Sequence, residues 1–273
     1  MRGRIAIGVL ALGGCYQATA PAIDAAPAID APVAAPDAVA PMHAGIVFVV
    51  PVDPLTSIRT GANARFVAGS LGSLEPDAPM PGCTLRALTS HCVARSCTSY
   101  VPTDDAGALH VTLRGTDTFD MSVVTEPTPI GSDRLYDGAT TAALAPGDEV
   151  TVSGDGATVP AFTVSATAPP FVDDTYPWPG ILSRTEDATF TWPAADVVVV
   201  VIAHYPPTEE FVYCTWSGMA STTLEAAVIA GFAEAETVSV GVDVINEQRV
   251  VAGDYVIELQ VASQTSNNYE IAP

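Results

Sequence analysis

The residues of this chain best suited to chemistry are its cysteines and histidines. Cys83, Cys92 and Cys97 lie close together in the sequence, and His91 directly precedes the second of them. Thiolates and imidazoles are ligands that zinc prefers in proteins. However, the spacing contains no Cys-x-x-Cys pair, so we expect these three cysteines and Cys214 to form disulfides rather than a metal site.

Acyl-transfer chemistry would need a serine, a histidine and an acid that meet in space. The sequence has no Gly-x-Ser-x-Gly motif, and the segment most similar to that motif is Gly69-Ser70-Leu71-Gly72. We expect the histidines to lie on the surface or at strand edges; they are His43, His91, His110 and His204. The sequence therefore predicts no catalytic residues and no cofactor.

Acidic and aromatic residues offer weaker candidates. Three acid pairs lie in segments with turn-like sequences; they are Asp104-Asp105, Asp173-Asp174 and Glu209-Glu210. We expect their carboxylates to be solvated, and the alternative is calcium binding near Asp173-Asp174. We expect Trp192 and Trp216 in the core and Trp178 at a domain junction. The alternative is that Tyr176, Trp178 and Trp216 form an exposed binding face for a sugar or peptide.

The first fifteen residues have the order of an export signal. Basic Arg2 and Arg4 precede an apolar run from Ile5 to Leu12, and small residues lead to Cys15. The run of eight residues is far shorter than the roughly 20 that span a bilayer. The alternatives are a signal peptide that is cleaved near Ala18 or Ala20, and a plain N-terminal strand.

The text Leu12-Gly13-Gly14-Cys15 resembles the lipobox of bacterial lipoproteins. The resemblance implies residues 1–15 as a signal through the lipobox, with acyl chains such as palmitate on Cys15. Two or more chains anchor a protein stably to a membrane. Because Tyr16 rather than Asp follows, the resemblance further implies the outer membrane of the cell envelope.

The cysteine count agrees with this assignment. Of five cysteines, lipidation of Cys15 leaves four, an even number that fits two disulfides in an oxidising compartment. Three pairings are possible, and the sequence does not choose among them. At least one bridge must be local to residues 83–97, and if all four pair, Cys214 must bond back to that segment.

The charge balance excludes several classes of partner and mechanism. Removal of residues 1–15 takes away two arginines and no acid, so 8 basic and 31 acidic residues leave a net charge of −23. Such a surface repels nucleic acid and anionic headgroups. All ten basic residues are arginine. Without lysine, Schiff-base chemistry and a P-loop are excluded.

Composition along the chain suggests a stalk and two domains. Residues 16–42 repeat Ala, Pro and Asp, and we expect a disordered, extended linker. Short Val- and Thr-rich segments with turns between them then predict an all-β protein. We expect two β-sandwich-like domains, a Cys-containing one at 43–168 and a second at 169–273.

The expected elements follow from alternation and turn signals. Segment 107–113 alternates as a half-buried strand, and 197–203 is apolar enough to be buried on both faces. Thr222 and Glu225 have the spacing of a capping box, which predicts one short helix at 224–232. Further strands are expected at 46–50, 65–68, 119–124, 149–153, 159–164, 188–192, 211–216, 238–244 and 253–261.

Two further resemblances involve whole segments. Residues 171–263, with Trp192 early and Tyr255 late, resemble immunoglobulin-like and fibronectin type III-like sandwiches. The lipobox, the low-complexity stalk, the Cys-x8-Cys-x4-Cys segment and the Pro146–Val152 turn resemble predicted lipoproteins of unknown function from high-GC bacteria. The first resemblance implies a fold, and the second implies no activity.

Together these observations predict a lipid-anchored envelope protein that is not an enzyme. We expect its head to be a binding or structural module, with a protein or glycan as partner and no nucleic acid. The alternative is an exported hydrolase or other enzyme whose site is built from loops. That alternative requires His110 or His204 to meet a carboxylate in a concave pocket.

Overall fold

The structure is a computed structural model in which sixteen strands and one short helix account for most of the described residues. These residues are 43–51, 59–68, 83–97, 103–128, 131–172, 178–204, 210–232 and 236–272. The predicted all-β class with one short helix is confirmed. The predicted signal (1–15) and linker (16–42) lie outside the described residues and stay predictions.

The strands of the first half cover most of its described length. They are β1 (His43–Pro51), β2 (Thr60–Ala68), β3 (Cys83–Ala87), β4 (Cys92–Cys97), β5 (Leu109–Leu113), β6 (Asp117–Thr128), β7 (Gly131–Thr140), β8 (Glu149–Gly154) and β9 (Phe162–Thr167). The second half follows with β10 (Leu182–Ser183), β11 (Ala188–Thr191), β12 (Val197–His204), β13 (Glu210–Ser217), β14 (Ser221–Leu224), α1 (Ala226–Ala230), β15 (Thr237–Ala252) and β16 (Tyr255–Ala272).

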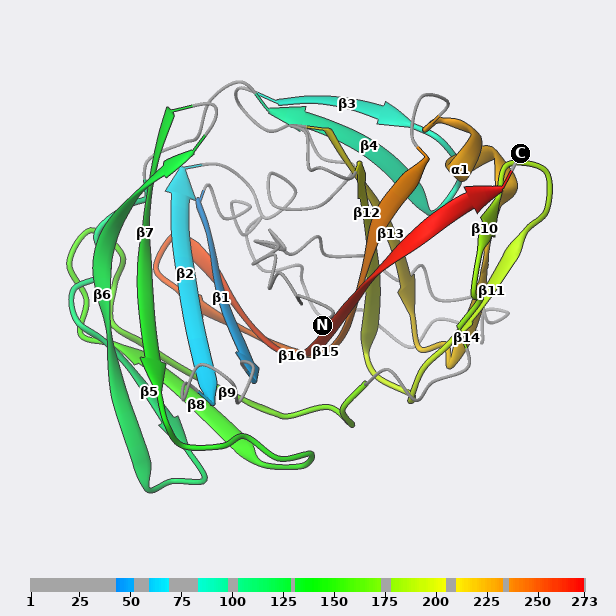
Figure 1. The fold of residues 1–273 in the computed structure, drawn as a ribbon. Helices are drawn as coiled ribbons and strands as arrows, with labels where there is room; N and C mark the ends of the chain where they lie inside the picture. Colours follow the sequence, from blue (N-terminus) through cyan, green and yellow to red (C-terminus); the bar gives the residue numbers. More distant parts are fainter. Residues whose placement is uncertain are drawn as a thin grey trace, which may run out of the picture.

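One strongly curved sheet runs through both halves of the chain (Figure 1). Its order is β3-β4-β13-β12-β15-β16-β1-β2-β7-β6-β5-β8-β9, with β10 beside β16, while β11 and β14 form a second sheet. Strand β1 pairs in parallel with β16, which joins the beginning of the described chain to its end. Strands β3 and β4 lie next to β13, far from their neighbours in the sequence.

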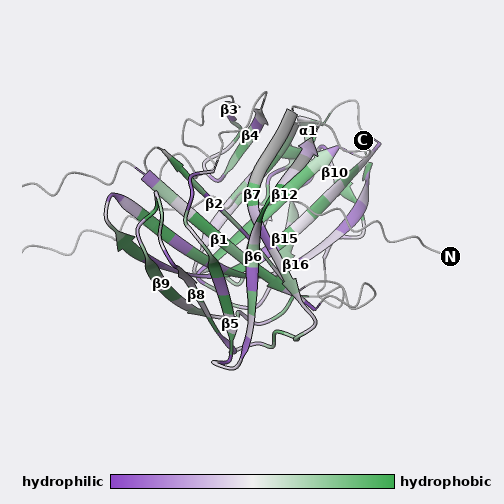
Figure 2. Ribbon diagram, turned by 90° about the vertical axis from the view of Figure 1, so that its left-hand side faces the viewer, coloured by the Kyte–Doolittle hydropathy of each residue, from purple (hydrophilic) through white to green (hydrophobic). Residues whose placement is uncertain are grey.

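The core of the first half follows from strict alternation along its strands. In β5, Leu109, Val111 and Leu113 are buried. The alternate residues His110 and Thr112 are only partly covered. The three buried side chains pack in one cluster with side chains of β8 and with the ring of Phe66. Figure 2 shows hydrophobic and hydrophilic segments alternating along β5, β8 and β9. One face of this sheet is therefore core, and the other is polar.

The core of the second half gathers around β12. The expected burial of this strand on both faces is confirmed, because Val197 to Ala203 are all buried. Val198, Val200 and Ile202 pack in a cluster with the two buried tryptophans, while Val199 and its alternate neighbours pack on the other face with Tyr213. An unbroken apolar run is thus needed to supply two cores at once.

The hairpin β15–β16 connects the two cores. The first part of β15, Val238 to Val244, packs in the core around β12. At the other end of the hairpin, Ile257, Leu259 and Val261 of β16 pack in the core of the first half. The boundary near residue 169 stays a prediction, and the structure adds that residues 255–261 support the first core.

The short helix is present, but its expected cap is not formed. Helix α1 begins after Glu225, whose side chain makes no capping hydrogen bond. Thr222 lies in β14, paired with Phe190, so its extended backbone is committed to a sheet. Instead, Asp187 Oδ1 accepts a hydrogen bond of 2.8 Å from the backbone N–H of Ala226. A tertiary contact thus replaces the local capping box.

No helix in the described part of the chain is both long enough and apolar enough to span a membrane.

Candidate functional site

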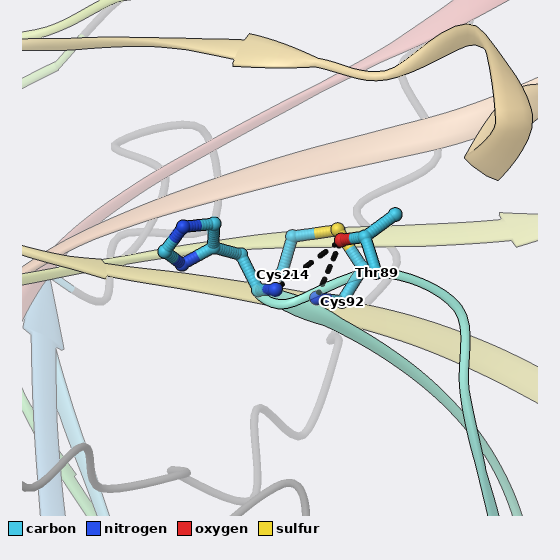
Figure 3. Close-up of a disulfide and its surroundings, with 4 residues drawn as sticks. Thr89, Cys92 and Cys214 are labelled. Carbon is cyan, nitrogen blue, oxygen red and sulfur yellow. Dashed lines mark hydrogen bonds between the residues drawn. A yellow bond between two sulfur atoms is a disulfide. The ribbon is translucent and has the colours of Figure 1, made fainter.

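The cysteine site lies where β4 and β13 pair. Cys92 and Cys214 are bonded to each other, with Cα atoms 4.0 Å apart and a sequence separation of 122. Both side chains are buried in the second core. Close to the bridge, Thr89 Oγ1 accepts a hydrogen bond of 3.2 Å from the backbone N–H of Cys92 (Figure 3). The expected bond from Cys214 back to segment 83–97 is confirmed.

The other predicted cysteines have different outcomes. Cys83 and Cys97 occupy opposite positions in the register of β3 and β4, and their pairing stays a prediction. Cys15 lies outside the described residues. Among those described, no group of three or more His, Cys, Asp or Glu side chains could hold a metal ion.

Three of the four histidines pack against aromatic rings. His91 stacks on Trp216 with ring centroids 5.9 Å apart, and His43 stacks on Tyr255 at 4.6 Å. His204, at the end of β12, meets the ring of Phe232 edge-on at 4.9 Å. These contacts give each imidazole a packing role.

His110 is the histidine placed best for proton chemistry. Its Nδ1 lies 2.7 Å from Asp120 Oδ1 on β6, and its Nε2 lies 3.6 Å from Asp155 Oδ1 after β8. The hydrogen bond to Asp120 raises the pKa of His110, burial opposes this rise, and the charges of both aspartates raise the pKa further. Two carboxylates therefore stabilise the imidazolium from opposite sides.

Ser153 completes a row of Asp, His and Ser across three strands. It lies opposite His110 in the register of β5 and β8, just as Asp120 does in that of β5 and β6. The row lies on the polar outer face, where 34% of the His110 side chain and 72% of the Asp120 side chain are exposed. Because both imidazole nitrogens face carboxylates, this arrangement favours holding a proton over activating the serine.

The first acid pair is structural. Asp104 Oδ2 accepts a hydrogen bond of 2.9 Å from the hydroxyl of Tyr255, and Asp105 Oδ1 accepts one of 3.1 Å from that of Tyr136. The expectation of purely solvated turn residues is thus too simple here, because both carboxylates attach their loop to core tyrosines. Asp173-Asp174 and Glu209 lie outside the described residues, and Glu210 begins β13.

The tryptophans lie inside the second half. Trp192 and Trp216 are buried, 3% and 4% exposed, which confirms their predicted place in the core. Trp178 is half-buried against that core, and its Nε1 donates a hydrogen bond of 2.9 Å to the carbonyl of Thr191. Tyr176 lies outside the described residues. Trp216 therefore cannot contribute to the alternative, an exposed aromatic binding face, because its side chain is buried.

The sequence patterns did not reveal a charged cluster on the hairpin β15–β16, in which Arg249 and Glu247 surround the buried Glu258. Arg249 Nε donates a hydrogen bond of 2.7 Å to Glu258 Oε2, and Arg249 Nη2 lies 3.5 Å from Glu247 Oε1. Glu258 is fully buried. Burial raises the pKa of Glu247 to about 7; the Glu258 carboxylate raises it too, and Arg249 opposes the shift.

Asp243 lies further along β15, also fully buried. Its Oδ1 accepts a hydrogen bond of 2.8 Å from Gln264 Nε2, while its Oδ2 has no hydrogen-bond partner within the described segments. Burial raises the pKa of Asp243 to about 7, and the hydrogen bond from Gln264 opposes the rise. Alternation did not reveal this burial, because Asp243 lies between Val242 and Val244 at a position that the pattern assigns to a polar, solvent-facing side.

Comparison with known proteins gives no family. No protein-family model matches the chain, and no curated protein matches it significantly. Among solved structures, a two-domain fibronectin type III segment of chicken tenascin matches at 14% identity over 69% of this chain and 97% of that one, with a TM-score of 0.23.

Two other solved structures show likeness at the same level. Domains FN1–FN3 of chicken CNTN1 match at 14% identity over 70% of this chain and 67% of that one, with a TM-score of 0.20. A pullulanase from Anoxybacillus sp. LM18-11 matches at 15% identity over 60% of this chain, with a TM-score of 0.19. The match spans about a quarter (24%) of the pullulanase. TM-scores this low assign the chain to no fold family.

Proposed function

We propose that this chain is a lipid-anchored protein of the bacterial cell envelope, in which a folded head is joined to the anchor by a stalk. Cys15 carries the acyl chains, residues 16–42 form the spacer, and the β-rich part is displayed at its end. The observation that carries this proposal is the disulfide between Cys92 and Cys214. Disulfides persist in exported proteins and are rare in the reducing cytosol, so the bridge supports reading residues 1–15 as an export signal.

The head acts as a non-enzymatic binding or structural module with a protein or glycan partner in the envelope. Its tryptophans and three of its histidines serve packing, and its first acid pair holds a loop. A net charge of −23 after removal of residues 1–15 suits a soluble, displayed head and disfavours nucleic acid as a partner.

One observation favours the second candidate, an exported hydrolase. The row formed by Asp120, His110 and Ser153 has the residue types of a catalytic triad. A general base must be unprotonated when the nucleophile attacks. The two carboxylates beside His110 raise its pKa and so favour the protonated form, which cannot accept the serine proton.

Two assays on the detergent-solubilised mature protein separate these candidates. One measures binding to a glycan array and to purified peptidoglycan, and the other measures turnover of ester, peptide and glycoside substrates. A binding module retains a glycan or peptidoglycan without turnover. Turnover that His110→Gln and Ser153→Ala both abolish, while the exposed-site control Glu270→Gln leaves it unchanged, would replace the proposal with the hydrolase.

A further inference from the structure

We infer that Cys83 and Cys97 form a second disulfide, so that the chain carries the bridges 83–97 and 92–214. The backbone register of the β3–β4 hairpin carries this inference. In that antiparallel pair Cys83 lies directly opposite Cys97, and Ala87 lies opposite Val93 at the other end.

The register places the two residues within reach of a bond. Directly opposed residues of antiparallel strands have Cα atoms about 4.5–5.5 Å apart. Disulfides join residues whose Cα atoms are about 4.4–6.8 Å apart. The same kind of cross-strand position is already bridged once in this sheet, since Cys214 lies opposite Cys92 in the register of β13 and β4.

Elimination leads to the same pair. Of the three pairings open to four cysteines, only one contains the bond between Cys92 and Cys214. That pairing leaves Cys83 and Cys97 for each other. Oxidation of the two thiols releases two protons and two electrons. A disulfide-bonded thiol oxidoreductase of the exported compartment accepts them and leaves as a dithiol.

The two bridges together would lock one end of the large sheet. Strand β3 is the last in the order β3-β4-β13. An edge strand exposes unpaired backbone groups and is the part of a sheet that frays or pairs with other chains. With bonds from β3 to β4 and from β4 to β13, each of the last two strand junctions has a covalent link.

The arginines of this chain make the connectivity directly readable. Trypsin cleaves after arginine here, since the chain has no lysine, and each of the four cysteines falls on a peptide of its own. These peptides are 66–86 with Cys83, 87–95 with Cys92, 96–114 with Cys97 and 185–249 with Cys214. The mature protein is alkylated at acidic pH in urea, digested without reductant and analysed by mass spectrometry.

We expect two linked species, 66–86 with 96–114 and 87–95 with 185–249. A link between 66–86 and 185–249 would overturn the inference. So would alkylated Cys83 and Cys97 in a protein whose Cys92–Cys214 bond is intact. Four alkylated cysteines would overturn it together with the proposed export, whereas an intact 87–95/185–249 link leaves export standing. As matched controls, Cys83→Ser should expose one reactive thiol and Cys83→Ser/Cys97→Ser none.

Discussion

Cys92 and Cys214 face each other across β4 and β13 although they are 122 positions apart in the chain. Their bond attaches a hairpin from the first half of the sequence to the sheet of the second half. Both sulfur-bearing side chains are buried among the aromatic and valine residues of that core. The bridge is therefore part of the core as well as a constraint on the unfolded chain.

Removal of this bridge should destabilise the head strongly. A bond that closes a loop of more than a hundred residues restricts the unfolded state by about 3–5 kcal/mol. We expect the variant Cys92→Ala/Cys214→Ala to lose about that free energy of unfolding in urea titrations followed by tryptophan fluorescence. Wild-type protein in reductant should approach the variant. Equal urea midpoints for the wild type and the variant would show that the bridge contributes nothing.

Asp243 should make the head less stable as the pH rises. Its pKa is raised from 3.8 to about 7 by burial, so the folded state holds the proton more tightly than the unfolded state does. Stability from this group is complete below about pH 4 and is lost as the pH rises through 7. We expect Asp243→Asn to exceed the wild type in unfolding free energy at pH 8 by about 4 kcal/mol.

The control for this effect is Glu270→Gln, which removes an exposed carboxylate from the same hairpin. It should follow the wild type at both pH 5 and pH 8. At pH 4, Asp243→Asn should likewise be close to the wild type, because the native carboxyl is then neutral too. A variant that is less stable than the wild type at pH 8 would contradict the account of Asp243.

His110, like Asp243, should stabilise the head at low pH and lose this contribution as the pH rises. Its pKa is raised in the folded state, so its contribution is present below the unfolded value of 6.5 and is lost as the pH rises through the folded pKa. We expect His110→Gln to lower the thermal midpoint at pH 5.5 and to have no effect at pH 9. The loss should be small, below about 1 kcal/mol, because the ion pairs are solvent-exposed.

The imidazole itself can be followed by NMR. The C–H resonances of His110 should titrate with a pKa above 6.5 in the wild type, and Asp120→Asn should shift the midpoint downward. A midpoint that does not change in Asp120→Asn would show that this carboxylate does not hold the proton.

Gly45 should be intolerant of even one methyl group. A Cβ at this position in β1 would lie 2.8 Å from Cε1 of Phe66 and closer still to Cδ1 of the same ring. The ring is fully buried and cannot move aside without disturbing its neighbours. We expect Gly45→Ala to cost about 1–3 kcal/mol in urea unfolding. Gly180→Ala, where a Cβ meets nothing within 4 Å, is the control and should stay near the wild type.

Local alternation was enough to predict much of the fold. The segment 107–113 alternates in the sequence and forms β5 from Leu109, and the apolar run at 197–203 forms a strand buried on both faces. Both patterns depend only on whether each residue of the segment is buried or exposed, so they can be recognised without knowing which strands pair. The expected strand at 159–164 is displaced to Phe162–Thr167, because Pro160 has no N–H to give to a ladder.

Pairing between distant segments was beyond the reach of these patterns. Nothing in the sequence of β1 indicates that this strand pairs in parallel with β16. Nothing in the sequences of β3 and β4 indicates that β4 pairs with β13. The helix cap shows the same limit, since Asp187 supplies it from 39 residues away. Cys214 was the exception, because an even count of cysteines required a distant partner.

The most direct test of the account concerns Cys15. Cells that express the full chain and the variant Cys15→Ser are fed an alkyne analogue of palmitate, and membranes are separated from soluble fractions. We expect a labelled wild-type protein in the outer-membrane fraction, and a Cys15→Ser variant that carries no label and is lost from that fraction. An unlabelled wild type, or undiminished outer-membrane association of the variant, would contradict it.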